Sequence, residues 1–235
     1  VSSAKRMDRP DLFTIDFKVK ERYSSVSIGI ALIRGVDIKQ IDDRLETEKK
    51  DFLASLAGLT TEQLGQYPEI VSYRKLYKEM GIDWHSRRPS PEALLRRVAL
   101  GKGLYTINTC VDAYNLVVMN NRVSVGAFDY DSVKFPTVLR YAREGDEILL
   151  LGDTEVTKYT VKELAYYDKE GGYNIDFNFR DAQRTMVTEK TQNVWINVDG
   201  IYEITPEQVE QSLRESVEKI VAYCGGTVEF QGVVV

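Results

Sequence analysis

Histidine and cysteine are scarce in this sequence. It has one histidine, His85, and two cysteines, Cys110 and Cys224. One imidazole excludes a multi-histidine metal cage, and two thiols exclude both a four-cysteine zinc site and a disulfide scaffold. We therefore expect no metal ion and no cofactor.

Long apolar runs are also absent. No run approaches the ~18 residues that a membrane-spanning helix needs. The first 13 residues, VSSAKRMDRPDLF, lack the apolar stretch of a signal peptide. We therefore expect no membrane partner and a cytoplasmic location.

Positive charge is in deficit, with 31 Lys and Arg against 36 Asp and Glu and a net charge of −5. This balance argues against an indiscriminate nucleic-acid binder, and we expect no DNA partner. Residues 87–102 nevertheless carry a net charge of +4. They are either a solvated helix face or a patch that follows RNA phosphates, and the candidate RNA-binding residues are Arg87, Arg88, Arg96, Arg97 and Lys102.

The pattern of apolar residues predicts one α+β domain over residues 1–235, with residues 1–65 as a candidate N-terminal subdomain. We expect a central mixed or antiparallel sheet flanked by helices. Alternation predicts a strand over 13–20, and an apolar run predicts a more central strand over 26–34. Short β-like runs fill 122–198, and 227–235 can close the sheet.

Apolar residues at three- and four-residue spacing predict helices over 37–57, 67–80, 92–102, 110–121 and 206–223. Ser90, Thr109 and Thr205 are the expected N-caps of the last three helices, with Asp112 completing a capping box with Thr109.

Several short motifs have plain structural explanations. Gly101-Lys102-Gly103 lacks the rest of a phosphate-binding loop and is expected to end a helix. Asp129-Tyr130-Asp131 lacks the remaining ligands of a calcium loop and is expected to be a surface turn. One interpretation is a Cys110–His85 nucleophile pair, because a thiol at a helix start has a lowered pKa. The other is that Cys110 is a small apolar residue and His85 a solvated loop residue.

Two polar groups carry more information. Asp112 and Asn115 share a helix face, where they can read a polar ligand, lock a neighbouring loop or cap the helix. Residues 178–193 are densely polar. Within them Arg180 and Arg184 can form a neutral network with Asp181 and Glu189, or clamp a carboxylate or phosphate.

These segments resemble the tRNA-editing domain of the phenylalanyl-tRNA synthetase beta subunit, and most closely its free-standing homologues. Three stretches carry the resemblance over about 67–235: 87–133, with its Asn-x-x-Val-Asp-x-x-Asn helix and Gly-Ala-Phe-Asp turn, 139–153 and 180–196. It implies an α+β fold with a cleft. In the synthetase this cleft removes tyrosine that is wrongly attached to the tRNA for phenylalanine, and a positioned water helped by the terminal hydroxyl of the tRNA cuts the ester.

The resemblance implies two sets of site residues. The catalytic candidates are Asn108, Asp112, Asn115, Gly126, Gln183, Arg184 and Thr185, and the substrate-binding candidates are Phe128, Asp129, Arg180, Asp181 and Glu189. Two positions depart from the synthetase pattern. Gly126 replaces a histidine, and Gln183 replaces the glutamate that reads the hydroxyl of tyrosine.

The leading hypothesis is a hydrolase that deacylates a mischarged tRNA in trans and lacks the domains of a complete synthetase. A non-catalytic tRNA- or RNA-binding module is the second hypothesis, since both departures remove groups tied to tyrosine editing. A small-molecule protein that binds an amino acid or hydrolyses an ester or amide is the third, because the chain is acidic. The substrate and the oligomeric state stay open.

Overall fold

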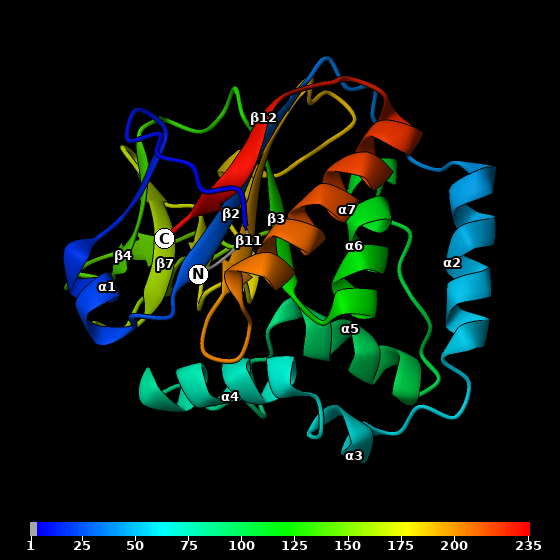
Figure 1. Ribbon diagram of the computed structural model, residues 1–235, viewed down its shortest axis with the longest axis horizontal. Coiled ribbons are helices and arrows are strands. Elements are labelled where there is room, and N and C mark those ends of the chain that lie inside the picture. The colour runs from blue at the N-terminus through cyan, green and yellow to red at the C-terminus, as the bar shows by residue number, and fades with distance from the viewer. Residues whose placement is uncertain (1–3) are drawn as a thin grey trace.

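A four-stranded antiparallel sheet forms the centre of the protein in a computed structural model, which describes residues 4–235 (Figure 1). Its strands are β2 (Ser27–Arg34), β3 (Ser124–Asp129), β11 (Asn193–Gly200) and β12 (Thr227–Val234). They lie in the order β12-β2-β11-β3. All of β2 except its last residue is buried, as its apolar sequence and central position require.

Two helices, α6 (Thr109–Asn121) and α7 (Pro206–Cys224), cover one face of this sheet (Figure 1). Gly29 of β2 lies beneath α7. A Cβ at this position would lie 3.1 Å from Val198 Cβ and 3.2 Å from Val209 Cγ1. A glycine here therefore lets the helix pack close to the strand.

A second sheet covers the opposite face. It consists of β1 (Phe13–Ile15), β4 (Thr137–Tyr141), β7 (Leu164–Asp168) and β8 (Gly171–Gly172) in the order β1-β4-β7-β8. β1 runs parallel to β4, and the other pairs are antiparallel. The amino-terminal segment thus contributes a strand to each sheet.

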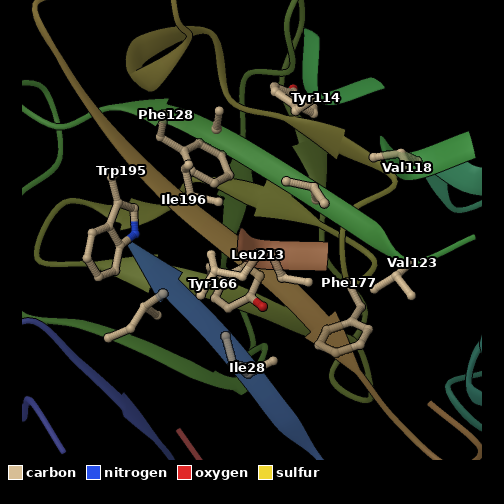
Figure 2. Close-up of a cluster of buried hydrophobic side chains, with 14 of the residues drawn as sticks. Ile28, Tyr114, Val118, Val123, Phe128, Tyr166, Phe177, Trp195, Ile196 and Leu213 are labelled. Atoms are coloured by element: carbon tan, nitrogen blue, oxygen red, sulfur yellow. The ribbon is translucent and has the colours of Figure 1, made fainter. Parts of the chain in front are cut away.

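Aromatic side chains fill the layer between the two sheets (Figure 2). The rings of Phe128 and Tyr173 meet edge to face at 4.7 Å between centroids, and those of Phe135 and Trp195 do so at 5.1 Å. Tyr166 and Phe177 are fully buried in the same layer. Edge-to-face pairs add to the stabilisation that burial of the rings provides.

The remaining elements lie around this core. The helices are α1 (Phe17–Arg22), α2 (Asp43–Ser55), α3 (Thr61–Leu64), α4 (Pro68–Glu79) and α5 (Ser90–Ala99). The short strands are β5 (Glu147–Ile148) with β6 (Thr157–Lys158) and β9 (Asn174–Ile175) with β10 (Arg180–Asp181), and a 3-10 turn, η1, spans Gln183–Thr185. None of the helices over residues 4–235 is long and apolar enough to cross a membrane.

The α+β fold with a central antiparallel sheet flanked by helices is confirmed. α4, α7, β2 and β12 follow the expected ranges within two residues. Thr205 is the N-cap of α7, and Gln208 completes its capping box.

Other local expectations were wrong. Residues 13–20 are not one strand, because the Asp16 side chain accepts a hydrogen bond from Lys18 N at 2.9 Å and starts α1. The helix expected from 37 begins at Asp43, where Asp42 caps it.

Two expected caps were also wrong. Ser90 is the first residue of α5, and its hydroxyl bonds Ser124 Oγ. Thr109 Oγ1 accepts from Lys39 N, so Asn108 caps α6 instead. In each case a tertiary partner takes the hydroxyl that local spacing assigns to the helix end.

Candidate nucleic-acid interface

A basic hollow of about 240 Å³ lies at the surface beside α5. We define the basic hollow by its lining residues, which are Ser86, Arg88, Ala93, Arg96, Arg97, Leu100, Lys102 and Phe179. Four of the five candidate RNA-binding cations therefore meet around one concavity. Arg96 and Arg97 come from the last turn of α5, and Lys102 comes from the turn that follows it.

The fifth cation, Arg87, is directed elsewhere. Its Nη1 lies 2.8 Å from Asp176 Oδ2 and 3.4 Å from Glu163 Oε1. Both carboxylates are buried, so the guanidinium neutralises charge that the interior otherwise holds unpaired. Arg87 supports the fold beside the hollow and does not line it.

Two of the cations in the hollow are held by other groups of the chain. Arg97 donates to the carbonyls of Lys102 and Gly103, and its guanidinium lies 3.8 Å from the centre of the Tyr105 ring. Arg88 donates to the carbonyl of His85 and lies 3.5 Å from Glu92. These contacts fix the two guanidinium groups in place.

The other two cations are open to a ligand. Within the described chain, neither the Arg96 guanidinium nor the Lys102 ammonium makes a hydrogen bond or ion pair. A hydrogen bond from its own backbone lowers the pKa of Glu62, and the nearby charge of Arg96 adds to this effect. Arg96 and Lys102 are therefore available to an anion.

The start of α6 is a closed polar cluster. Asn108 Oδ1 accepts from Val111 N at 3.0 Å and caps the helix. Asp112 Oδ1 accepts from Ile107 N at 3.0 Å, and its Oδ2 lies 3.1 Å from Lys49 Nζ. Burial raises the pKa of Asp112, although the hydrogen bonds from Ile107 N and Lys49 lower it. Of the roles considered for Asp112, the structure displays the locking of the preceding loop.

Asn115 lies one turn further along α6. With Asp112 and Lys49 it borders a recess of about 20 Å³, which has room for about one water molecule. No ligand larger than water fits this recess in its present shape. Asn115 and Asp112 thus share a helix face as expected, but that face is packed.

Gly126 and Phe128 lie on β3 and face the layer between the sheets. A Cβ at Gly126 would lie 2.7 Å from Asn178 Oδ1 and 3.0 Å from Phe128 Cζ. Asn178 therefore fills the space in front of the glycine. Phe128 itself is fully buried against Tyr173.

Asn178 belongs to a strained turn. Asp176, Phe177 and Asn178 have φ angles of 56°, 53° and 71°, which is the left-handed region that non-glycine residues avoid. The Arg87 contact holds Asp176, and Asn178 Nδ2 donates to Asp199 Oδ2 at 2.6 Å. Tertiary contacts on both sides therefore stabilise a turn that costs energy locally.

Asp199 is the centre of this buried polar network. Its carboxylate also accepts from the Tyr166 hydroxyl. Burial raises the pKa of Asp199 to about 7, although both hydrogen bonds oppose the shift. Loss of hydration, together with the charge of Asp199, raises the pKa of Asp181 to about 7 as well. Burial therefore moves the pKa of both Asp181 and Asp199 towards neutrality.

The arginines of the polar segment are paired. Arg180 reaches both carboxylate oxygens of Asp153, at 2.9 and 3.2 Å, and Arg184 reaches both oxygens of Asp168 at 2.8 Å. The expected neutral network among Arg180, Arg184 and their neighbours in sequence is therefore replaced by pairs with Asp153 and with Asp168 at the end of β7.

The other site candidates of this segment are spread out. Gln183 and Glu189 are exposed, and Thr185 is buried with a hydroxyl that makes no hydrogen bond within residues 4–235. Asp129 accepts from Asp131 N and from the Ser132 hydroxyl in a surface turn. None of these four residues lines the basic hollow or the recess beside Asp112 and Asn115.

The Cys110–His85 alternative was wrong. Cys110 is fully buried, and burial raises the pKa of its thiol well above the ordinary value. The His85 side chain is 66% exposed, bonds Asp83 and stacks on Trp84. Burial reverses the effect that a helix start has on a thiol. The described part of the chain also contains no cluster of His, Cys, Asp or Glu suited to a metal ion.

Sequence reasoning missed Lys49 and Asp199, and it placed Asn178 and Phe179 in the polar segment 178–193 without giving either a role. Lys49 follows the buried Leu45 by four residues on α2, and this spacing places a cation on an apolar face. The sequence therefore contained a signal for the buried position of Lys49. The roles of Asn178 and Asp199 depend on contacts between segments 21 residues apart, which local spacing does not reveal.

The fold and site define an α+β domain whose central sheet has helices on one face and a second sheet on the other, with a basic hollow at the surface. The chain belongs to the B3/4 domain family, whose model matches residues 72–225. This range contains all residues of the hollow and of the Asp199 network named above.

Two related proteins are informative. Over 106 residues, 45% of this chain, the sequence is 29% identical to the phenylalanine–tRNA ligase beta subunit of Cutibacterium acnes, and it spans 12% of that protein. The second is the solved N-terminal fragment of the phenylalanyl-tRNA synthetase beta subunit from Pyrococcus horikoshii. The match covers all of this chain and 57% of that fragment, with a TM-score of 0.50 and 15% identity. The latter likeness shows the fold alone.

Proposed function

We propose that this chain binds tRNA and acts as an editing hydrolase in trans, removing the amino acid from a mischarged tRNA. Membership of the B3/4 family and similarity to a phenylalanine–tRNA ligase beta subunit suggest a tRNA-related role. The observation that carries the proposal is the gathering of four cations around one hollow on a chain of net charge −5. Positive charge concentrated at one place favours contact with a short part of an RNA, while the acidic remainder of the surface repels the rest of the RNA.

The chemistry rests on positioning. An aminoacyl ester hydrolyses when water attacks its carbonyl carbon, so an enzyme that orients the ester and the water accelerates the reaction without a covalent intermediate. Asp181 adjoins Phe179 of the hollow across one residue, and its pKa of about 7 suits a group that accepts a proton from water at neutral pH. We assign Asp181 the role of general base. Thr185 and Gln183, on the turn that follows β10, remain the catalytic candidates that the resemblance implies.

The test is a panel of mischarged tRNAs. We expect release of amino acid from at least one pair above the rate without protein, and a strong loss of this activity in Asp181→Asn. Arg184→Ala, which leaves Asp168 without its partner, is measured beside Lys50→Gln, a change at an exposed α2 residue. Failure of every pair to react, with tRNA bound, would reject the hydrolase.

A non-catalytic tRNA-binding module is the second candidate. The observation that favours it is the filling of the space before Gly126 by Asn178. In the same panel this candidate predicts salt-dependent binding without release of amino acid. For both candidate functions we propose a cytoplasmic location, since both act on tRNA that takes part in translation.

A further inference from the structure

We infer that the basic hollow holds one unpaired nucleotide of an RNA strand, with its phosphate between Arg96 and Lys102 and its base against Phe179. The inference rests on the proposed function and names the part of the RNA that this site takes.

The phosphate half of the site follows from the state of the cations. Arg88 and Arg97 already have protein partners, which orient them. The side chains of Arg96 and Lys102 have no hydrogen-bond partner within residues 4–235, and both residues line the hollow. A phosphate group satisfies a guanidinium and an ammonium at once.

The base half follows from Phe179. This half-buried residue is the aromatic member of the lining, beside the apolar Ala93 and Leu100. Phe179 N donates to Ile175 O at 2.9 Å and so closes the left-handed turn that precedes it. The strained turn therefore fixes Phe179 on the wall of the hollow. An aromatic ring beside cations is the pair of groups that single-stranded nucleic acid uses, the ring for the base and the charge for the backbone.

The size of the hollow selects the form of the RNA. Its volume of about 240 Å³ is below the ~300–1,000 Å³ typical of sites for drug-sized ligands, so it accepts one nucleotide unit. In an RNA helix the bases are stacked inside and cannot reach an aromatic residue in a surface hollow. The ligand is therefore a nucleotide of an unpaired stretch or end.

The experiment uses a single-stranded RNA tetranucleotide that contains 2-aminopurine, whose fluorescence falls when the base stacks. The full chain is titrated with this probe, and inorganic phosphate and a blunt RNA duplex are used as competitors. The variants are Phe179→Leu, Phe179→Tyr and the double change Arg96→Gln with Lys102→Gln, with Lys50→Gln as the matched control. Thermal unfolding checks that each variant is folded.

We expect the wild-type chain and Lys50→Gln to quench the probe equally. Phe179→Leu abolishes the quenching and weakens binding about tenfold, as expected for one lost base stack, while Phe179→Tyr retains both. The double variant weakens competition by inorganic phosphate, which Phe179→Tyr leaves unchanged. The duplex competes poorly.

Unchanged quenching in Phe179→Leu, or a duplex that competes as well as the single strand, overturns the inference. Deacylation of mischarged tRNA without binding of the tetranucleotide also overturns it and leaves the proposed function standing. Phe179-dependent binding without any deacylation supports the inference and rejects the hydrolase.

Discussion

The basic hollow and the buried polar network around Asp199 differ in how their charged groups are satisfied. In the hollow, Arg96 and Lys102 face solvent without partners in the described residues. In the interior, Asp199 accepts hydrogen bonds from Tyr166 and Asn178, and at the start of α6 the buried Asp112 is paired with Lys49. The comparison teaches that dense polar sequence marks a ligand site only where the chain does not itself supply the partners. Changes in the interior should therefore alter stability, and changes in the hollow should alter binding.

The largest effect on stability is expected at Lys49. Lys49→Met leaves the buried Asp112 carboxylate without its cation, and loss of one partner of a buried pair typically costs about 3–5 kcal/mol. Urea unfolding should show this loss, while tRNA binding at low temperature persists. Lys49→Met combined with Asp112→Asn should recover part of it. A variant as stable as the wild type would show that the pair is not what fixes the start of α6.

A smaller loss is expected when Gly126 is replaced. The Cβ of Gly126→His collides with Asn178 Oδ1, and overpacking of this kind costs about 1–3 kcal/mol. Asn178→Gly is compatible with the left-handed turn and opens the space, so the double variant should lose less than the two single losses added together. Additive losses in urea unfolding would mean that Asn178 does not fill the space in front of Gly126.

The pH dependence of stability should report Asp199. Its pKa is about 7 in the folded chain and about 3.9 when unfolded, so between these values the folded state binds the additional proton. The free energy of unfolding therefore falls as the pH rises through this window, by at most about 1.4 kcal/mol per pH unit, and this contribution is constant above pH 7. Asp199→Asn should lack this component. Parallel stability curves for the two proteins would contradict the assignment.

The sequence predicted the architecture better than the site. Apolar spacing over β2 and α7 and the Thr205 cap are local signals, and the basic residues of α5 are close enough in sequence to meet at one surface. The pairing of Arg180 with Asp153 and of Arg184 with Asp168 joins segments that are separate in sequence. Spacing cannot show such pairs, because either arginine could equally have faced a ligand.

Salt-dependent tRNA binding tests the central claim most directly. The logarithm of the association constant of the wild-type chain should fall linearly with the logarithm of salt concentration. Arg96→Gln with Lys102→Gln should reduce the slope by about 0.7–0.9, the counterion release expected for one phosphate contact, without changing the urea midpoint. Lys50→Gln should leave both unchanged. If the double variant binds tRNA with the affinity and slope of the wild type, the basic hollow is not the interface.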